Sequence, residues 1–326
     1  MRAFLLVALV VLACATACGG AVTRPTGGVL VYAKPNAPLA GYTGHHEDVW
    51  VAQLDGSRPW KLTSGVQPSV SPDGRLVAFG SGSQVLLEST QGGPAAVLYT
   101  IGGRWPVVYV PPVWAPDSEH LAIEVERGRL LVVDVVTRQR SLLPATQSFS
   151  FSPDSRRIVY EARGDLYVIP TMGGTPRQLT HDGKDVAPVW GKPGIAFTRF
   201  RTRSHTGDIW LMDAGRTRMR RLTHSGVGFA PAFFSADGTR LLAAIPPSHN
   251  GQLWAVDVRT GKARAITPLV GDLNAEGLSS DGKTVLASVG CGGMVSPYGY
   301  VETIPFTGGK PHVIARGPCR ASWNPG

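Results

Sequence analysis

The chain has 326 residues, of which 43% are hydrophobic and 17% are charged, with 40 glycines and 26 prolines. This composition supports a buried core and argues against disorder, coiled coil and collagen. Glycine and proline interrupt the chain too often for long helices, and no sustained 3.6-residue periodicity follows the N-terminus. The formal net charge of +9 favours anionic partners. No aromatic and basic motif typical of nucleic-acid binding accompanies it, so we expect no nucleic-acid partner.

The first element along the chain is an apolar run from Ala3 to Ala17, preceded by Arg2. The run is shorter than the roughly 20 apolar residues that a membrane-spanning helix needs, and it ends in small residues typical of an export signal. We therefore expect residues 1–17 to be a signal peptide and residues 18–27 to be a linker. The mature protein is expected on the outer face of the cytoplasmic membrane or in the periplasm.

The end of this run, Ala15-Thr-Ala-Cys-Gly19, resembles the lipobox of bacterial lipoproteins, in which a cysteine is acylated and becomes the new N-terminus. The resemblance implies lipid attachment at Cys18 and anchoring to a membrane through that lipid. Cys14 also fits the pattern, although it would leave a very short hydrophobic region. In a third interpretation, an ordinary signal peptidase cleaves after Ala17 and neither cysteine is modified.

A short string that ends in Asp-Gly or Asp-Ser recurs along the rest of the chain. Copies lie at Pro68–Gly74, Pro112–Ser118, Phe151–Ser155, Phe234–Gly238 and Leu278–Gly282, with a degenerate copy at Pro188–Gly194. The bulky residue before each turn marks seven units, at Val70, Trp114, Phe151, Trp190, Phe234, Leu278 and Trp323. Seven units over Gly28–Gly326 give about 43 residues per unit, which is typical of a four-stranded propeller blade.

Each unit also contains the strands of a blade in the expected order. An apolar strand such as Leu76–Phe79 follows the turn, then a strand with an early aromatic residue such as Asp208–Trp210, then a strand ending in Leu-Thr, as at Leu222-Thr223. These strings resemble the TolB-like β-propeller repeat, a WD40-like family found in envelope proteins. We predict an all-β, seven-bladed β-propeller over residues 28–326. The carboxylates of the repeated turns, Asp73, Asp117, Asp154, Asp237 and Asp281, are expected to accept hydrogen bonds from turn amides rather than to act in catalysis.

The first unit lacks its own marker strand, since Gly27–Tyr32 already has the pattern of a second strand. The segment Arg320–Gly326 has the pattern of a marker strand, so we expect the C-terminus to supply the innermost strand of blade 1. Closing the ring in this way removes two exposed sheet edges. Cys291 and Cys319 would then lie on one face near the seam, where an oxidising compartment favours a disulfide. Two buried free thiols are the alternative.

The loops between the second and third strands are long in blades 5, 6, 7 and 1, which are consecutive around a closed ring. Together they form a predicted lip on one face, and loops on a rigid scaffold are common sites of recognition. The residues expected to line it are Tyr42, His45, His46, Arg201, Arg203, His205, His249 and Tyr298, with Arg199 at the base. A solvated rim without a role is the alternative. The arginines at 216, 218, 220 and 221 are expected to keep the outer strand of blade 5 soluble, or to contact lipid headgroups or an acidic polymer.

Motifs of catalysis are missing from the sequence: we find no G-x-S-x-G, phosphate-binding loop or H-E-x-x-H. Seven blades also leave no residues for the separate hydrolase domain of propeller peptidases. We therefore expect a monomeric, non-catalytic binding scaffold for an envelope protein or an anionic envelope component, with no metal and no cofactor. The alternative is a metal-dependent enzyme or binding protein acting on acidic polysaccharide, with ligands from His45–Asp48, His205 and His249.

Overall fold

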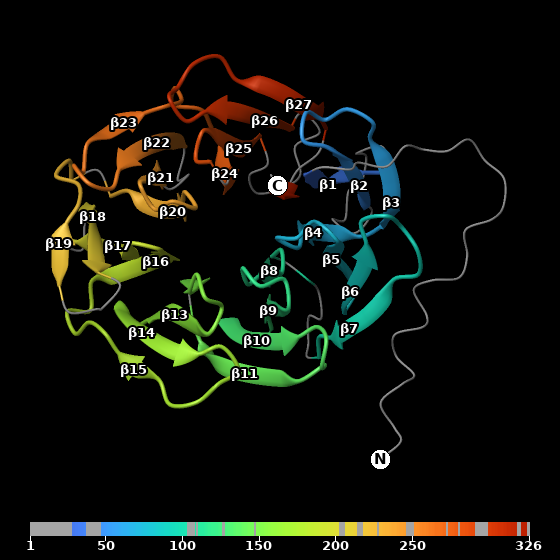
Figure 1. Ribbon diagram of the computed structural model, residues 1–326, viewed down its shortest axis with the longest axis horizontal. Helices are drawn as coiled ribbons and strands as arrows, with labels where there is room; N and C mark the ends of the chain where they lie inside the picture. The colour runs from blue at the N-terminus through green and yellow to red at the C-terminus, as the bar shows by residue number, and fades with distance from the viewer. Residues whose placement is uncertain are drawn as a thin grey trace.

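The computed structural model describes residues 28–36, 47–102, 108, 110–125, 128–146, 148–201, 206–213, 218–226, 228–245, 251–271, 273–279, 281–290, 299–317 and 321–324. These residues form 28 β-strands in seven four-stranded antiparallel sheets. Figure 1 shows the sheets arranged as blades around a common centre. The predicted seven-bladed β-propeller is thereby confirmed. The described chain contains no helix long and apolar enough to cross a membrane. The predicted signal peptide, Cys18 and the linker lie outside the described residues.

Each blade has four strands, which are named below from the innermost strand outward. Blade 1 consists of β28 (Ala321–Asn324), β1 (Val29–Pro35), β2 (Glu47–Gln53) and β3 (Trp60–Ser64). Blade 2 consists of β4 (Val66–Val70), β5 (Leu76–Ser81), β6 (Gln84–Ser89) and β7 (Ala96–Thr100). Blade 3 consists of β8 (Val113–Trp114), β9 (His120–Glu124), β10 (Arg129–Asp134) and β11 (Arg140–Ala145).

Blades 4 to 7 follow the same plan in chain order. Blade 4 consists of β12 (Ser148–Phe151), β13 (Arg157–Ala162), β14 (Asp165–Pro170) and β15 (Arg177–Gln178). Blade 5 consists of β16 (Asp185–Gly191), β17 (Gly194–Phe200), β18 (Gly207–Asp213) and β19 (Met219–Arg221). Blade 6 consists of β20 (Ala230–Phe234), β21 (Arg240–Ile245), β22 (Gln252–Asp257) and β23 (Ala263–Ala265). Blade 7 consists of β24 (Asn274–Leu278), β25 (Thr284–Val289), β26 (Tyr300–Pro305) and β27 (His312–Arg316).

The C-terminal strand closes the ring as predicted. Strand β28 pairs antiparallel with β1, with Trp323 in register with Leu30, and Figure 1 shows the end of the chain beside β1 near the centre. Trp323 also packs on blade 7, because a Cβ added at Gly277 would come within 2.5 Å of its indole nitrogen. On the other side, the hydroxyl of Ser322 accepts a hydrogen bond of 3.2 Å from the amide of Val70 in blade 2.

The hydrophobic core is divided among the interfaces between blades rather than gathered in one place. One cluster of buried side chains lies between each pair of neighbouring blades. At the seam, Leu30 and Tyr32 of blade 1 pack against Leu286 and Val301 of blade 7. Each sheet therefore needs a neighbour on both faces to bury its apolar side chains.

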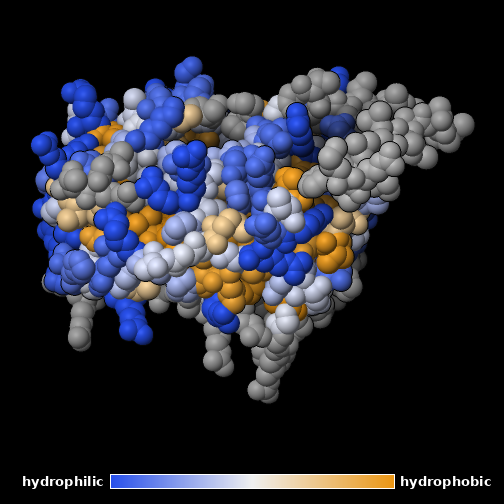
Figure 2. All heavy atoms as spheres, turned by 60° about the horizontal axis from the view of Figure 1, so that its bottom comes forward, coloured by the Kyte–Doolittle hydropathy of each residue, from blue (hydrophilic) through white to orange (hydrophobic). Residues whose placement is uncertain are grey.

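The outer wall is mixed in polarity. Figure 2 turns the lower edge of Figure 1 forward, and it shows separate orange hydrophobic patches among blue hydrophilic residues. Exposed apolar side chains of blade 3 include Val136 and Leu142. Scattered apolar residues of this kind are ordinary on soluble surfaces.

The repeated aspartates stabilise the turns, as expected. The carboxylate of Asp73 accepts hydrogen bonds from the amide of Arg75 at 3.1 Å and the hydroxyl of Ser71 at 2.6 Å. Each of the other four aspartates also accepts a hydrogen bond from a backbone amide of its turn. These carboxylates fix the connection between the first and second strands of blades 2, 3, 4, 6 and 7.

The residue after each of these aspartates adopts a left-handed backbone conformation, which favours glycine. Gly74 has a φ of 73°, whereas Ser118 and Ser155 occupy the equivalent position with φ values of 63° and 58°. The serine hydroxyls accept hydrogen bonds of 3.0 Å from the amides of Asp73 and Asp117 in the preceding blade. A hydrogen bond between blades thus offsets the backbone strain of a serine at this position.

The threonine of the Leu-Thr pair also has a structural role. The hydroxyl of Thr180 accepts a hydrogen bond of 2.9 Å from the amide of Leu166, and Thr223 binds the amide of Ile209 at the same distance. The threonine therefore satisfies a backbone donor near the start of the third strand, where the ladder with the fourth strand ends.

Deleting residues 320–326 is expected to abolish folding or to lower the melting temperature by more than about 10 °C. The deletion removes β28 and exposes an edge of β1 together with the apolar seam. Circular dichroism melting of the two chains measures the effect. A chain that lacks only residues 325 and 326 retains β28 and serves as the control. An unchanged melting curve for the longer deletion would contradict ring closure as a requirement for stability.

A buried carboxyl lies in blade 2, where other blades place apolar side chains. Glu88 on β6 is 5% exposed, and burial raises its pKa from 4.5 to about 7. Since burial disfavours the charged form, the folded state binds a proton more tightly than the unfolded state does. The resulting cost in stability is absent below the unfolded pKa, grows between pH 4.5 and 7, and is complete above about pH 7.

Replacing Glu88 with glutamine is therefore expected to raise the free energy of unfolding by about 2–3 kcal/mol at pH 8, because it removes a buried charge. The gain should shrink as the pH falls from 7 towards 4.5. Urea denaturation at several pH values measures it. Glu124→Gln, at an exposed position on β9, is the control and should change stability by less than about 0.5 kcal/mol. A gain of equal size at every pH would show that charge burial is not the cause.

Candidate functional site: a cationic pocket on blade 5

Two kinds of connection meet on one face of the ring: the loops between second and third strands, and the links between blades. The amide of Asp185, at the start of β16, donates a hydrogen bond of 2.7 Å to the carbonyl of Gly164 in the β13–β14 turn. The amide of Gly228 binds the carbonyl of Gly207 in the same way at 3.0 Å. We call this side the loop face, and the opposite side, which carries the aspartate turns, the turn face.

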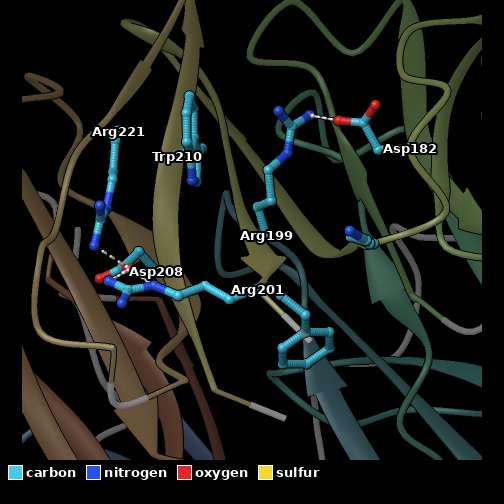
Figure 3. Close-up of a pocket in the computed structure, with 8 residues that line it drawn as sticks. Asp182, Arg199, Arg201, Asp208, Trp210 and Arg221 are labelled. Atoms are coloured by element: carbon cyan, nitrogen blue, oxygen red, sulfur yellow. Dashed lines mark hydrogen bonds and ion pairs between the residues drawn. The ribbon is translucent and has the colours of Figure 1, made fainter. Parts of the chain in front are cut away.

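A hollow of about 440 Å³ lies on the loop face at blade 5. Its lining consists of Asp182, Lys184, Arg199, Phe200, Arg201, Asp208, Trp210 and Arg221. They come from the link between blades 4 and 5, the facing ends of β17 and β18, and the end of β19. Figure 3 shows Arg201 and Arg221 converging on Asp208, with Arg199 reaching towards Asp182.

Asp208 is the buried anion on one side of the pocket and is 1% exposed. Arg201 and Arg221 contact one of its oxygens at 2.8 and 2.7 Å, and the amide of Gly226 donates to the other at 3.0 Å. Burial by itself would raise the pKa of Asp208, but the bonds from Gly226 and Arg201 and the charge of Arg221 outweigh it and lower the pKa. The carboxylate therefore stays ionised and holds both guanidinium groups in place.

Arg199 is the central cation on the other side. Its guanidinium makes two bonds of 2.7 Å to the fully buried carboxylate of Asp185, and it lies 3.1 Å from Asp182. It also stacks 4.9 Å from the ring centre of Trp210. The hydrogen bonds that Arg199 donates to Asp185 raise the pKa of Arg199, against the opposing effect of burial. Arg199 is therefore a fixed positive charge.

The pocket is suited to binding an anion. Each of the three arginines has five N–H donors, and the bonds to the aspartates use only part of each set. The exposed ammonium of Lys184 adds a further donor at the rim. Fixed, partly desolvated cations bind carboxylate or phosphate oxygens well because little order is lost on binding.

The structure describes only part of the predicted lip. Two residues named in that prediction line the hollow: Arg199 is the penultimate residue of β17, and Arg201 follows the end of that strand. The remaining lip residues lie outside the described residues: Tyr42, His45, His46, Arg203, His205, His249 and Tyr298. Cys291 and Cys319, the predicted disulfide partners, also lie outside them. Among the described side chains, no three of His, Cys, Asp and Glu gather as a metal site.

Two arginines on β19 act differently from the sequence-based prediction. Arg221 faces the pocket and binds Asp208 instead of merely keeping an outer strand soluble. Arg220 donates a hydrogen bond to the carbonyl of Val258 and so links blade 5 to blade 6. The three residues of β19 do not by themselves reveal which side each side chain faces. Asp182 and Lys184, in the link between blades 4 and 5, and the role of Trp210 on β18 in the pocket were not predicted either.

Comparisons with known proteins agree with this architecture. No protein-family model matches the chain. The tricorn protease homolog 1 of Streptomyces coelicolor is 26% identical in an alignment of length 257 that covers 68% of this chain and 23% of that protein. An uncharacterized Agrobacterium fabrum protein is 29% identical over 36% of this chain and 44% of its own length. The chain thus spans less than half the length of the curated relatives it matches.

Solved structures give closer agreement over the whole fold. TolB from Acinetobacter baumannii superposes with a TM-score of 0.55 and 18% identity, over 91% of this chain and 66% of that one. The chain has the TolB-like β-propeller fold. An oligogalacturonate lyase in complex with manganese matches this TolB-like propeller with a TM-score of 0.58 and 15% identity, over 89% and 86% of the two chains. Since one neighbour is named as a lyase, the fold alone does not decide whether this TolB-like chain is an enzyme.

Replacing Asp208 with asparagine is expected to lower the free energy of unfolding by about 2–4 kcal/mol, since it leaves two arginines without their buried anion. The lowered pKa of Asp208 stabilises the fold above the unfolded pKa of 3.8, and this contribution is lost as the pH falls through the folded pKa. The difference from the parent chain should therefore be full at pH 7 and shrink below about pH 4.

Chemical denaturation at pH 7 and at lower pH measures this difference. Asp165→Asn is the matched control, because Asp165 occupies the same position in blade 4 and accepts the amide of Gly183 at 2.9 Å, without a salt bridge to any described residue. Equal losses in the two variants would assign the stability to the amide hydrogen bond rather than to the arginine pairs.

Proposed function

We propose that the protein is a monomeric, exported binding propeller that holds an anionic component of the cell envelope on its loop face, with the blade 5 pocket as one contact site. The observation that supports this most directly is the convergence of Arg199, Arg201, Arg221 and Lys184 in one hollow on that face. The pocket includes Arg201, one of the lip residues proposed from the sequence, and Arg199, proposed for the base of the lip. The net charge of +9 favours the approach of an anionic partner.

The envelope location in this proposal rests on the N-terminal segment. The apolar run before Cys18 has the pattern of an export signal, and acylation at Cys18 would place the propeller beside a membrane. A tether of about ten residues would keep the partner and the propeller close to the same surface. The fold is shared with TolB, which supports a binding role by analogy only.

Acidic polysaccharide is the second candidate, as ligand or as substrate. The cations of the pocket would also bind the carboxylates of uronate sugars, and an oligogalacturonate lyase shares the fold. Asp208 is poorly suited to take up a proton in such a reaction at neutral pH, because its pKa is lowered. The metal-dependent form of this candidate would need the ligands proposed from the sequence, which are His45–Asp48, His205 and His249.

A photo-reactive amino acid placed at His181, which is exposed next to Asp182, is expected to cross-link in cells to one dominant protein. Arg201→Gln in the same chain should reduce the adduct at least about threefold, because it removes a half-exposed cation of the pocket. Mass spectrometry of the purified adducts identifies the partner.

The control places the same amino acid at Lys283, which is exposed on the turn face. Equal adducts from the two positions, or an adduct that does not depend on Arg201, would overturn the proposed binding site. Adducts to glycan alone would favour the polysaccharide candidate.

A further inference from the structure

Blade 1 contains the same arrangement of charged and aromatic side chains as the blade 5 pocket. In blade 5, Arg199 is in register with Asp208, and Trp210 is in register with Arg221. In blade 1, Lys34 is in register with Asp48, and Trp50 with Lys61. The third strands already share the pattern Asp-x-Trp, at Asp48–Trp50 and Asp208–Trp210. The strand register adds the basic residues that are paired with these positions.

The contacts in blade 1 repeat those of blade 5. The ammonium of Lys34 lies 5.9 Å from the ring centre of Trp50, as Arg199 stacks on Trp210. The ammonium of Lys61 lies 2.8 Å from the carboxylate of Asp48, as Arg221 pairs with Asp208. We call each set of four residues a cation–tryptophan module.

The module is not a general property of the repeat. In blade 4, Tyr167 is in register with Gln178, and in blade 6, Trp254 is in register with Ala265. The position of Lys34 and Arg199 is taken by Ala162 in blade 4 and by Ile245 in blade 6. Among the paired residues of the described strands, basic residues occupy both positions in blades 1 and 5 alone.

The two modules share the loop face, because each lies at the end of a second strand and the start of a third. Figure 1 shows blade 1 at the upper right of the ring and blade 5 at the left, with blades 6 and 7 between them on one side. Gly317 lies beside Lys34, since a Cβ added at Gly317 would be 3.8 Å from the side chain of Lys34, and the preceding residue is Arg316, which is exposed at the end of β27. A ligand that contacts both modules must span the face of the ring.

The tryptophans are not available as flat platforms for sugar rings. Trp210 packs against the cluster between blades 4 and 5, and Arg199 stacks on the ring. Trp50 packs against the cluster between blades 7 and 1, and Lys34 lies over the ring. What each module offers a ligand is therefore N–H donors, which suit the carboxylates of Asp and Glu side chains.

We propose that the two modules are separate anchors for one acidic protein partner, whose aspartate and glutamate side chains contact blades 1 and 5 at the same time. The inference rests on the proposed function and deepens it, since it names the class of partner and a second contact site. Two weak contacts to one partner act together through their high effective concentration. A short anion would occupy one module without sensing the other.

The test uses the full mature chain labelled with 5-fluorotryptophan, so that ¹⁹F resonances report on Trp50 and Trp210 separately. Two probes are titrated at moderate salt: tetraglutamate and poly-L-glutamate of about 100 residues, which can extend roughly 3 Å per residue. The polymer should shift both resonances with one dissociation constant. Lys34→Gln should weaken the polymer titration read at Trp210 by roughly 3- to 10-fold, and should leave the tetraglutamate titration at Trp210 unchanged.

The controls separate this inference from the proposed function. Arg75→Gln removes a charge that is 84% exposed on the turn face and should change neither titration. If Lys34→Gln leaves the polymer titration at Trp210 unchanged while Arg201→Gln weakens it, the two-anchor inference is wrong and the blade 5 site stands. If Arg201→Gln has no effect on either probe, the proposed function fails as well. If Arg75→Gln weakened polymer binding, read at Trp210, as much as Lys34→Gln does, the effect would come from general charge attraction, and the two-anchor inference would be wrong.

Discussion

The antiparallel pairing of β28 with β1 is the contact on which the rest of the structure depends. Every blade buries both faces against its neighbours, so an open ring would expose two apolar sheet faces and two strand edges at once. Trp323 of the last strand contacts both blades at the seam: it is in register with Leu30 of blade 1, and it packs on Gly277 of blade 7. The fold is therefore cooperative around the whole circle, although each blade is formed by local hairpins.

A closed ring also fixes where functional side chains lie. Strand order and antiparallel pairing place the described links between blades and the starts of the third strands on one face. Near the start of β14 and of β18, an aspartate lies beside such a link. Asp208 and Asp165 both use this position to bind a link amide. The pocket arises where arginines surround this common structural carboxylate, so the proposed anion binding would use a feature that the fold already needs.

The sequence predicted the fold well because its strongest signals are local. The turn with an aspartate and a left-handed residue can be recognised in each of its five copies, and the seven bulky residues that precede the turns set the number of blades. The pocket was predicted only in part, since its ion pairs join residues whose proximity depends on the register and on the next blade. Arg221 was therefore assigned to the outer surface, whereas it binds Asp208. The equivalence of Lys34 and Arg199 becomes visible only when the strands are paired.

The charge arrangement on the loop face explains how a protein could bind anions without a strongly exposed positive patch. Each prominent cation is held by a buried carboxylate: Lys61 by Asp48, Arg199 by Asp185, and Arg221 by Asp208. The carboxylate reduces the net field of the site, but it also fixes the direction of the remaining N–H donors, which lowers the entropy lost on binding. Such a site favours a partner whose carboxylates are already well placed over one that merely carries negative charge, because geometry then contributes more to affinity than long-range attraction does.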